Sequence, residues 1–123
     1  MSTEKIPNEN WLVVELKGKD VRDLDMRFEI SEGDELNQNV FGQAPCNSFR
    51  AMLQSAEGEF NLMILDKRGN VCSKELMEEE REYMRVLKRL SHYEIRENDE
   101  LNPTRRLYLI SFGDPTIVAI PED

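Results

Sequence analysis

The sequence has few of the residues from which catalytic and metal sites are built. Histidine occurs once, as His92, and cysteine twice, as Cys46 and Cys72. A lone histidine and two widely separated cysteines do not supply the clustered ligands of a metal site, and no glycine-rich phosphate loop is present. The many carboxylates fall at positions expected to face solvent, which leaves general acid–base chemistry without support. We therefore predict no catalytic residues, no metal site and no cofactor.

Positive charge and long apolar segments are scarce too. The chain has 16 lysines and arginines against 25 aspartates and glutamates, a formal net charge of −9. Nucleic-acid binding needs a clustered positive face. The pair Arg105-Arg106 is too small to provide one, so we expect no nucleic-acid partner. No apolar run approaches the roughly 20 residues of a membrane-spanning helix, so we also expect no membrane insertion.

The first ten residues are polar and contain no secretory signal. On this basis we expect a cytoplasmic protein, with a processed chain of the periplasm or cell envelope as the alternative. The length of 123 residues fits one domain with a single core. We predict a flexible polar arm over residues 1–9 that contributes little to the core. A single domain, expected to be a monomer, follows over residues 10–121.

Alternation of apolar and polar residues predicts about eight short strands. Between residues 25 and 30, for example, Met26, Phe28 and Ile30 would face inward, and the residues between them would face solvent. Residues 11–16 and 60–65 carry apolar side chains on both faces, which favours strands covered on both sides. Glu57-Gly58 suits a hairpin turn. The predicted strands are residues 11–16, 25–30, 39–42, 49–54, 60–65, 93–95, 106–112 and 116–120.

One long helix is predicted over about residues 74–90. Ser73 is a good N-cap, and apolar residues follow at three- and four-residue spacing in one stripe. Glutamates crowd the first half and basic residues the end. This order complements the helix dipole and so has a structural explanation; a partner-binding surface is the alternative. We predict an α+β fold in which a curved, mainly antiparallel β-sheet forms a partial barrel wrapped on this helix.

A turn-forming stretch at residues 40–49 separates two predicted strands and contains Cys46. Its glycine, proline and asparagine are typical of a constrained turn. Three states of Cys46 and Cys72 stay open. A disulfide between them would stabilise the fold by about 3–4 kcal/mol. A reducing cytosol would leave two thiols, and the structural alternative is two small buried apolar residues.

The order of these residues resembles the META-domain family, which includes HslJ-like bacterial proteins and the META proteins of trypanosomatid parasites. Gly42, Cys46, Asn47 and Phe49 resemble the family signature of a glycine, then Gly-Cys-Asn, then an aromatic residue. Cys72 resembles the second cysteine, which precedes a helix. The chain departs from the pattern at position 45, where proline replaces a glycine. Further matches are Trp11, Leu12, Glu15, Leu16, Gly18, Phe28, Val40, Glu79, Tyr83, Leu87, Leu107 and Leu109.

The resemblance implies a curved antiparallel sheet around one helix and no established enzymatic activity. Family members are associated with envelope stress and antibiotic tolerance in bacteria and with virulence in parasites. We therefore expect a non-enzymatic, stress- or virulence-associated interaction module with an unidentified protein partner. The second hypothesis is a binder of a small apolar ligand in a partly closed barrel, which requires an internal pocket of roughly 300 Å³. The third is an enzyme that uses Cys46 or Cys72.

Overall fold

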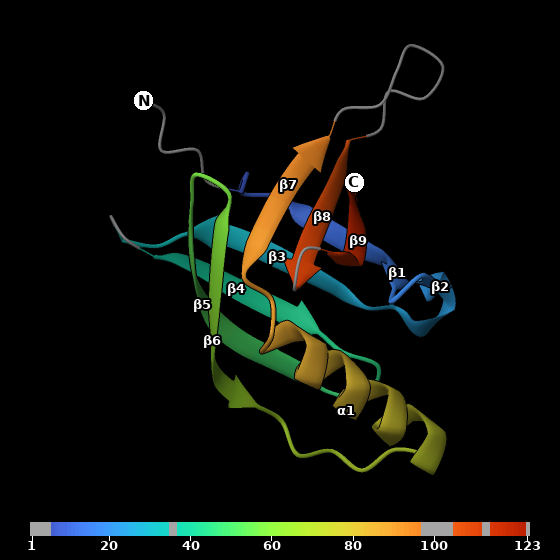
Figure 1. Ribbon diagram of the computed structural model, residues 1–123. Coiled ribbons are helices and arrows are strands. Elements are labelled where there is room, and N and C mark those ends of the chain that lie inside the picture. Colours follow the sequence, from blue (N-terminus) through green and yellow to red (C-terminus); the bar gives the residue numbers. More distant parts are fainter. Residues whose placement is uncertain (1–5, 35–36, 97–104, 112–113, 123) are drawn as a thin grey trace.

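The computed structural model describes residues 6–34, 37–96, 105–111 and 114–122 (Figure 1). These residues form nine strands, a short 3-10 helix η1 and one α-helix. The strands are β1 Asn10–Leu16, β2 Lys19–Asp20, β3 Arg27–Glu32, β4 Gln38–Gln43, β5 Ser48–Ala56, β6 Glu59–Lys67, β7 His92–Arg96, β8 Arg106–Ser111 and β9 Asp114–Pro121. The helices are η1 Arg22–Leu24 and α1 Lys74–Leu87.

The nine strands form one antiparallel sheet whose pairing runs in a ring. The order is β2-β1-β3-β4-β5-β6-β7-β8-β9, and β1 also pairs with β9. The ring is thinnest between β6 and β7, where the ladder consists of one residue pair, Glu59 and His92. Helix α1 follows β6 in the chain and lies across one end of the ring (Figure 1). The arrangement is ring-like rather than a regular barrel, and the predicted antiparallel α+β fold is confirmed.

Most predicted strands agree with the structure because their alternation is regular. In β3, Phe28 and Ile30 are buried while Glu29 is exposed. The hairpin between β5 and β6 turns at Glu57 and Gly58, both with positive φ, as a type I′ turn requires. The sequence predicts only a turn over residues 17–19, and the structure begins the short strand β2 at Lys19. The sequence also predicts a polar loop over residues 98–104, which, like residue 112, lies outside the described residues.

Two strands differ from prediction on their outer faces. The register between β1 and β9 shifts between Val13 and Glu15, a β-bulge that lets Trp11, Val13 and Leu16 all lie in the core. Strict alternation predicts Leu16 and Val13 on opposite faces of this strand, and the bulge makes that prediction wrong. In β6, Met63 is 63% exposed. The expectation that this strand is covered on both sides is wrong, because Met63 and Leu65 lie exposed on its outer face.

The core fills the interior of the ring and is covered by the inner face of α1. Trp11, Met26, Leu107 and Ile117 are among its most buried members, and α1 contributes Tyr83. An apolar cavity of about 20 Å³ remains between Tyr83 and the surrounding strands. Ligand pockets measure roughly 300 Å³ or more, so this cavity is too small for the apolar ligand of the second hypothesis.

The N-terminal segment is tied to the sheet more firmly than its polarity predicts. Ile6 is 1% exposed and belongs to the core. Its N–H donates to Ser55 Oγ at 3.1 Å, and its carbonyl accepts from Gln38 Nε2 at 2.8 Å. The expectation that residues 1–9 contribute little to the core is wrong for Ile6, because one isoleucine finds a buried position between strands. The domain boundary at residue 10 stays a prediction.

The described part of the chain includes no helix with both the length and the apolar character needed to span a membrane.

Candidate functional site

A tight corner joins β4 to β5 and holds the residues singled out by the sequence. Gly42 pairs with Phe49 across the two strands, and the Ala44 N–H donates to the Asn47 carbonyl at 2.9 Å to close the turn. A Cβ at position 42 would lie 2.2 Å from Cζ of Phe49. The glycine is therefore required by the aromatic ring that lies over it, rather than by an unusual backbone angle.

A disulfide connects this corner to the start of α1. Cys46 and Cys72 are bridged, with their Cα atoms 6.0 Å apart, within the range of an ordinary disulfide. Ser73 follows directly and caps the helix, because its Oγ accepts the Leu76 N–H at 3.3 Å. Of the three states left open for the cysteines, the structure has the bridge. Both sulfur atoms are covalently occupied, so neither serves as a thiolate nucleophile in this state.

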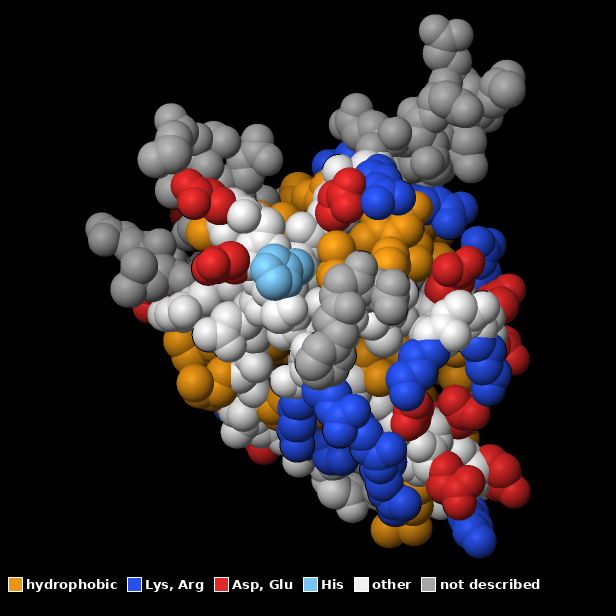
Figure 2. Space-filling model, in the orientation of Figure 1, with side chains coloured by type: hydrophobic (Ala, Val, Ile, Leu, Met, Phe, Trp, Pro, Cys, Tyr) orange, Lys and Arg blue, Asp and Glu red, His pale blue; other side chains and the backbone are white. Residues whose placement is uncertain are grey.

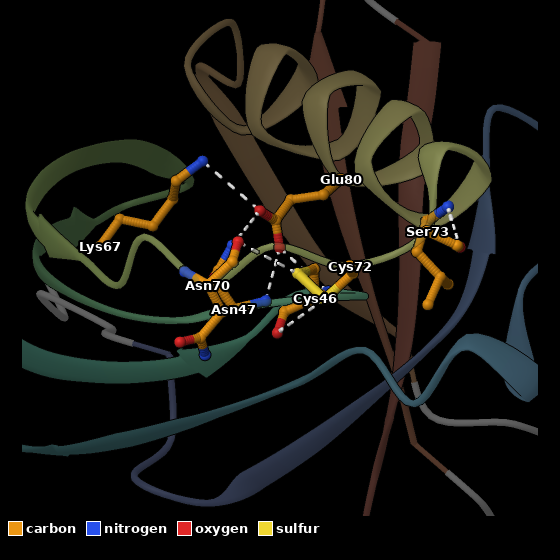
Figure 3. Close-up of a disulfide and its surroundings, with 8 residues drawn as sticks. Cys46, Asn47, Lys67, Asn70, Cys72, Ser73 and Glu80 are labelled. Atoms are coloured by element: carbon orange, nitrogen blue, oxygen red, sulfur yellow. Dashed lines mark hydrogen bonds and ion pairs between the residues drawn. A yellow bond between two sulfur atoms is a disulfide. The ribbon is translucent and has the colours of Figure 1, made fainter.

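Glu80 is the residue that sequence reasoning missed. It lies in a run of helical glutamates predicted to face solvent, yet it is 4% exposed. Its Oε1 accepts the backbone N–H groups of Cys46 at 3.0 Å and Asn47 at 2.7 Å. Its Oε2 accepts Asn47 Nδ2 at 2.7 Å and lies 3.5 Å from Lys67 Nζ. Figure 3 shows Glu80 reaching from α1 to these donors.

Asn47 uses both ends of its side-chain amide. While its Nδ2 donates to Glu80, its Oδ1 accepts the Asn70 backbone N–H at 2.8 Å. An aspartate at this position would lack the donor and place a second negative charge against Glu80. Asn47 thus connects the corner, the helix and the segment before Cys72, which explains why an asparagine follows the cysteine. We call Cys46, Asn47, Asn70, Cys72 and Glu80 the pinned corner.

The surroundings of Glu80 favour its charged form. Burial by itself would raise the pKa of this carboxyl. Hydrogen bonds from the Asn47 side chain and from the Asn47 and Cys46 backbone, together with the charge of Lys67, outweigh that effect and hold the pKa below its usual value. Glu80 is therefore an anion that holds structure together, unlike the catalytic carboxyls that burial keeps protonated.

The sequence-predicted residues otherwise form no chemical cluster. His92 lies exposed on β7, and its Nδ1 is 2.8 Å from Ser91 Oγ. Within residues 6–34, 37–96, 105–111 and 114–122, no three His, Cys, Asp or Glu side chains are grouped to hold a metal ion. What the pinned corner can do is fix the geometry of the surface next to it.

That surface is a groove of about 670 Å³ between α1 and the segment that follows β6. The buried residues Asn47, Glu80 and Met84 lie at its floor, and the exposed Met77 and Val71 add apolar contact area. Its rim is basic. We call it the basic groove, with the charged lining residues Lys67, Arg68, Arg81, Arg85, Lys88 and Arg89.

The basic groove corrects an expectation drawn from overall charge. Arg81, Arg85 and Lys88 recur at four- and three-residue spacing, which places them on one face of α1, and the fold adds Lys67 and Arg68 from β6 and the segment after it. Figure 2 shows Lys and Arg side chains gathered over α1, with acidic side chains toward its N-terminal end. A clustered positive face is thus present in a chain of net charge −9. The helical spacing was the signal that could have found it.

Comparison with known proteins gives one match. A family model described as META domain matches residues 4–109 of the chain. No curated protein and no solved structure matches it.

Proposed function

The chain belongs to the META domain family, and on that premise we propose that it is a non-enzymatic protein-interaction module whose binding surface is the basic groove. The observation that carries the proposal is the position of the groove directly over the pinned corner. A disulfide and a buried carboxylate with four donors within 3.5 Å fix its floor. A surface held in one conformation in advance loses little entropy on binding.

The cellular setting is part of the same proposal. We place the protein among stress- or virulence-associated proteins, as the family resemblance implies, and we expect it to act as a monomer. Disulfides persist in oxidising compartments. The Cys46–Cys72 bridge therefore favours the periplasm or cell envelope over the cytoplasm.

Each of the two competing functions requires a feature that the described residues do not provide: a free thiolate for the enzyme and a large internal cavity for the carrier. An enzyme based on Cys46 or Cys72 requires a thiolate, but both sulfurs form the bridge. A carrier of an apolar ligand requires internal volume, and the cavity inside the ring is about 20 Å³. The groove over the pinned corner is larger, open and charged, which suits a partner presented from outside.

Site-specific photo-crosslinking in the cells that produce the protein tests the proposal. One probe replaces Val71, which is 86% exposed at the groove, and a matched probe replaces Phe41, which is 56% exposed on β4. We expect a discrete crosslinked protein from position 71 and none from position 41. Crosslinks from position 41 alone would show that the binding surface lies outside the basic groove. No protein crosslink at either position, or substrate turnover abolished by a single substitution, would contradict an interaction module.

A further inference from the structure

We propose that the basic groove binds a short acidic peptide segment of a partner protein, with its carboxylates against Arg81, Arg85 and Lys88 and its apolar side chains against Met77 and Val71. This inference rests on the proposed function and specifies the chemistry of the partner. It follows from the charge, the shape and the lining of the groove.

The charge of the groove is not neutralised within the described residues. Its lining includes six basic side chains and one carboxylate, Glu80. Of the six, Lys67 pairs with Glu80 and Arg85 with Glu82. Arg68, Arg81, Lys88 and Arg89 have no carboxylate within ion-pair distance in the described part of the chain. Such a cluster attracts an anionic segment.

On the opposite side of α1, in contrast to the groove, two of the glutamates are paired with lysines. There, Glu79 lies 3.4 Å from Lys19 Nζ, and Glu82 lies 2.5 Å from Lys17 Nζ. Glu75 and Glu78 line the same surface. One face of the helix therefore pairs Glu79 and Glu82 with lysines, whereas on the groove face Arg81 and Lys88 have no carboxylate within ion-pair distance among the described residues. Arginine is suited to such presentation because its planar guanidinium binds carboxylates through two hydrogen bonds.

The negative charge on the floor of the groove does not oppose this partner strongly. Glu80 already accepts hydrogen bonds from Cys46, Asn47 and Lys67. It is 4% exposed, so it offers little charged surface to an incoming carboxylate. The cations, in contrast, all lie on exposed side chains at the rim.

The size and lining favour a peptide over a nucleic acid. A volume of about 670 Å³ accommodates a short segment rather than a folded domain. Met77 is 37% exposed and offers an adaptable apolar contact for peptide side chains, and the exposed Val71 adds a second one. Among the described residues, no aromatic side chain lines the groove to stack a base. Beyond the groove, a net charge of −9 repels a long polyanion.

Fluorescence anisotropy with defined probes tests the inference. The probes are a labelled peptide of glutamates interspersed with leucines, its counterpart with lysine in place of glutamate, and oligothymidylate of the same length. The proteins are wild type, Arg81→Glu with Arg85→Glu, and Arg22→Glu with Arg50→Glu, which makes the same charge change at exposed positions outside the groove. Circular dichroism confirms that each variant is folded. If the charge-reversed groove variant is not folded, the milder pair Arg81→Gln with Arg85→Gln replaces it.

Of the three probes, we expect only the acidic peptide to bind, and its affinity should fall as the salt concentration rises. The groove reversal should weaken it by roughly tenfold or more, and the control reversal by much less. Equal binding of the lysine peptide, tighter binding of oligothymidylate, equal loss in the control pair, or no binding would overturn the inference. The photo-crosslinking result is independent of these outcomes. A crosslinked partner at position 71 without acidic-peptide binding would leave the interaction module standing and refute only the acidic partner.

Discussion

Glu80 is the residue on which the local structure depends most. Removing a carboxylate from water costs several kcal/mol, and Glu80 is 4% exposed. The cost is offset by three hydrogen bonds of 2.7–3.0 Å from Cys46 and Asn47, each contributing about 1.5–3 kcal/mol when the acceptor is charged. Glu79 and Glu82 of the same helix pair instead with lysine and arginine side chains at the surface.

We predict that Glu80→Gln destabilises the protein in a pH-dependent way. The pKa of Glu80 is lowered in the folded state, so its stabilising effect is present above the ordinary glutamate pKa of about 4.3 and is lost as pH falls toward the folded value. Urea unfolding should show a loss of about 1–3 kcal/mol at pH 7, and this gap should narrow as the pH falls below the ordinary glutamate pKa of about 4.3. The exposed Glu78→Gln should change stability by less than about 0.5 kcal/mol. A gap independent of pH would refute the role given to Glu80.

Gly42→Ala should destabilise the corner by about 1–3 kcal/mol, because the added Cβ overlaps the Phe49 ring and displaces it. Gly69→Ala is the matched control, since a Cβ there meets no atom within 4 Å. Thermal unfolding of the two variants measures the difference. Equal melting temperatures would show that Phe49 moves aside freely and that the signature glycine is not set by this contact.

At the scale of elements, alternation and capping predict most of the fold. Strands such as β3 follow from residues that are buried and exposed in turn, and Ser73 marks the start of α1. The bulge at Val14 was not predictable, because it depends on the register with β9. The burial of Glu80 depends on a corner far away in sequence. The signature residues of the site could be identified from the sequence, but the role of the carboxylate that connects them could not.

The Cys46–Cys72 bridge joins two elements, so its loss should loosen the connection between β5 and α1. We predict that Cys46→Ser with Cys72→Ser lowers the free energy of unfolding by about 3–4 kcal/mol. Reductant should lower the stability of wild type by a similar amount and leave the double variant unchanged. Mass measurement after alkylation in urea without reductant should find no modified cysteine. Modification of both would contradict the bridge.

At the scale of the whole molecule, the fold gathers basic side chains on one side of α1 and acidic side chains on the other. Glutamates dominate the first half of α1 and basic residues its end, and the helix also places Glu79 and Glu82 toward β1 and β2, and Arg81 and Lys88 toward the groove. The ring of strands supplies a rigid, filled support, and the pinned corner fixes the segment opposite the helix. The result is a positive groove on a molecule whose net charge is −9.

Chemical-shift mapping tests most directly whether this groove is the binding surface. The acidic glutamate–leucine peptide is titrated into isotope-labelled wild-type protein, and the backbone amide signals are followed. The account predicts that the shifted amides fall within residues 67–71 and 77–89, which form the two walls of the groove. Shifts centred on the outer faces of β4 and β6 around Phe41 and Met63, or no shifts at all, would contradict it.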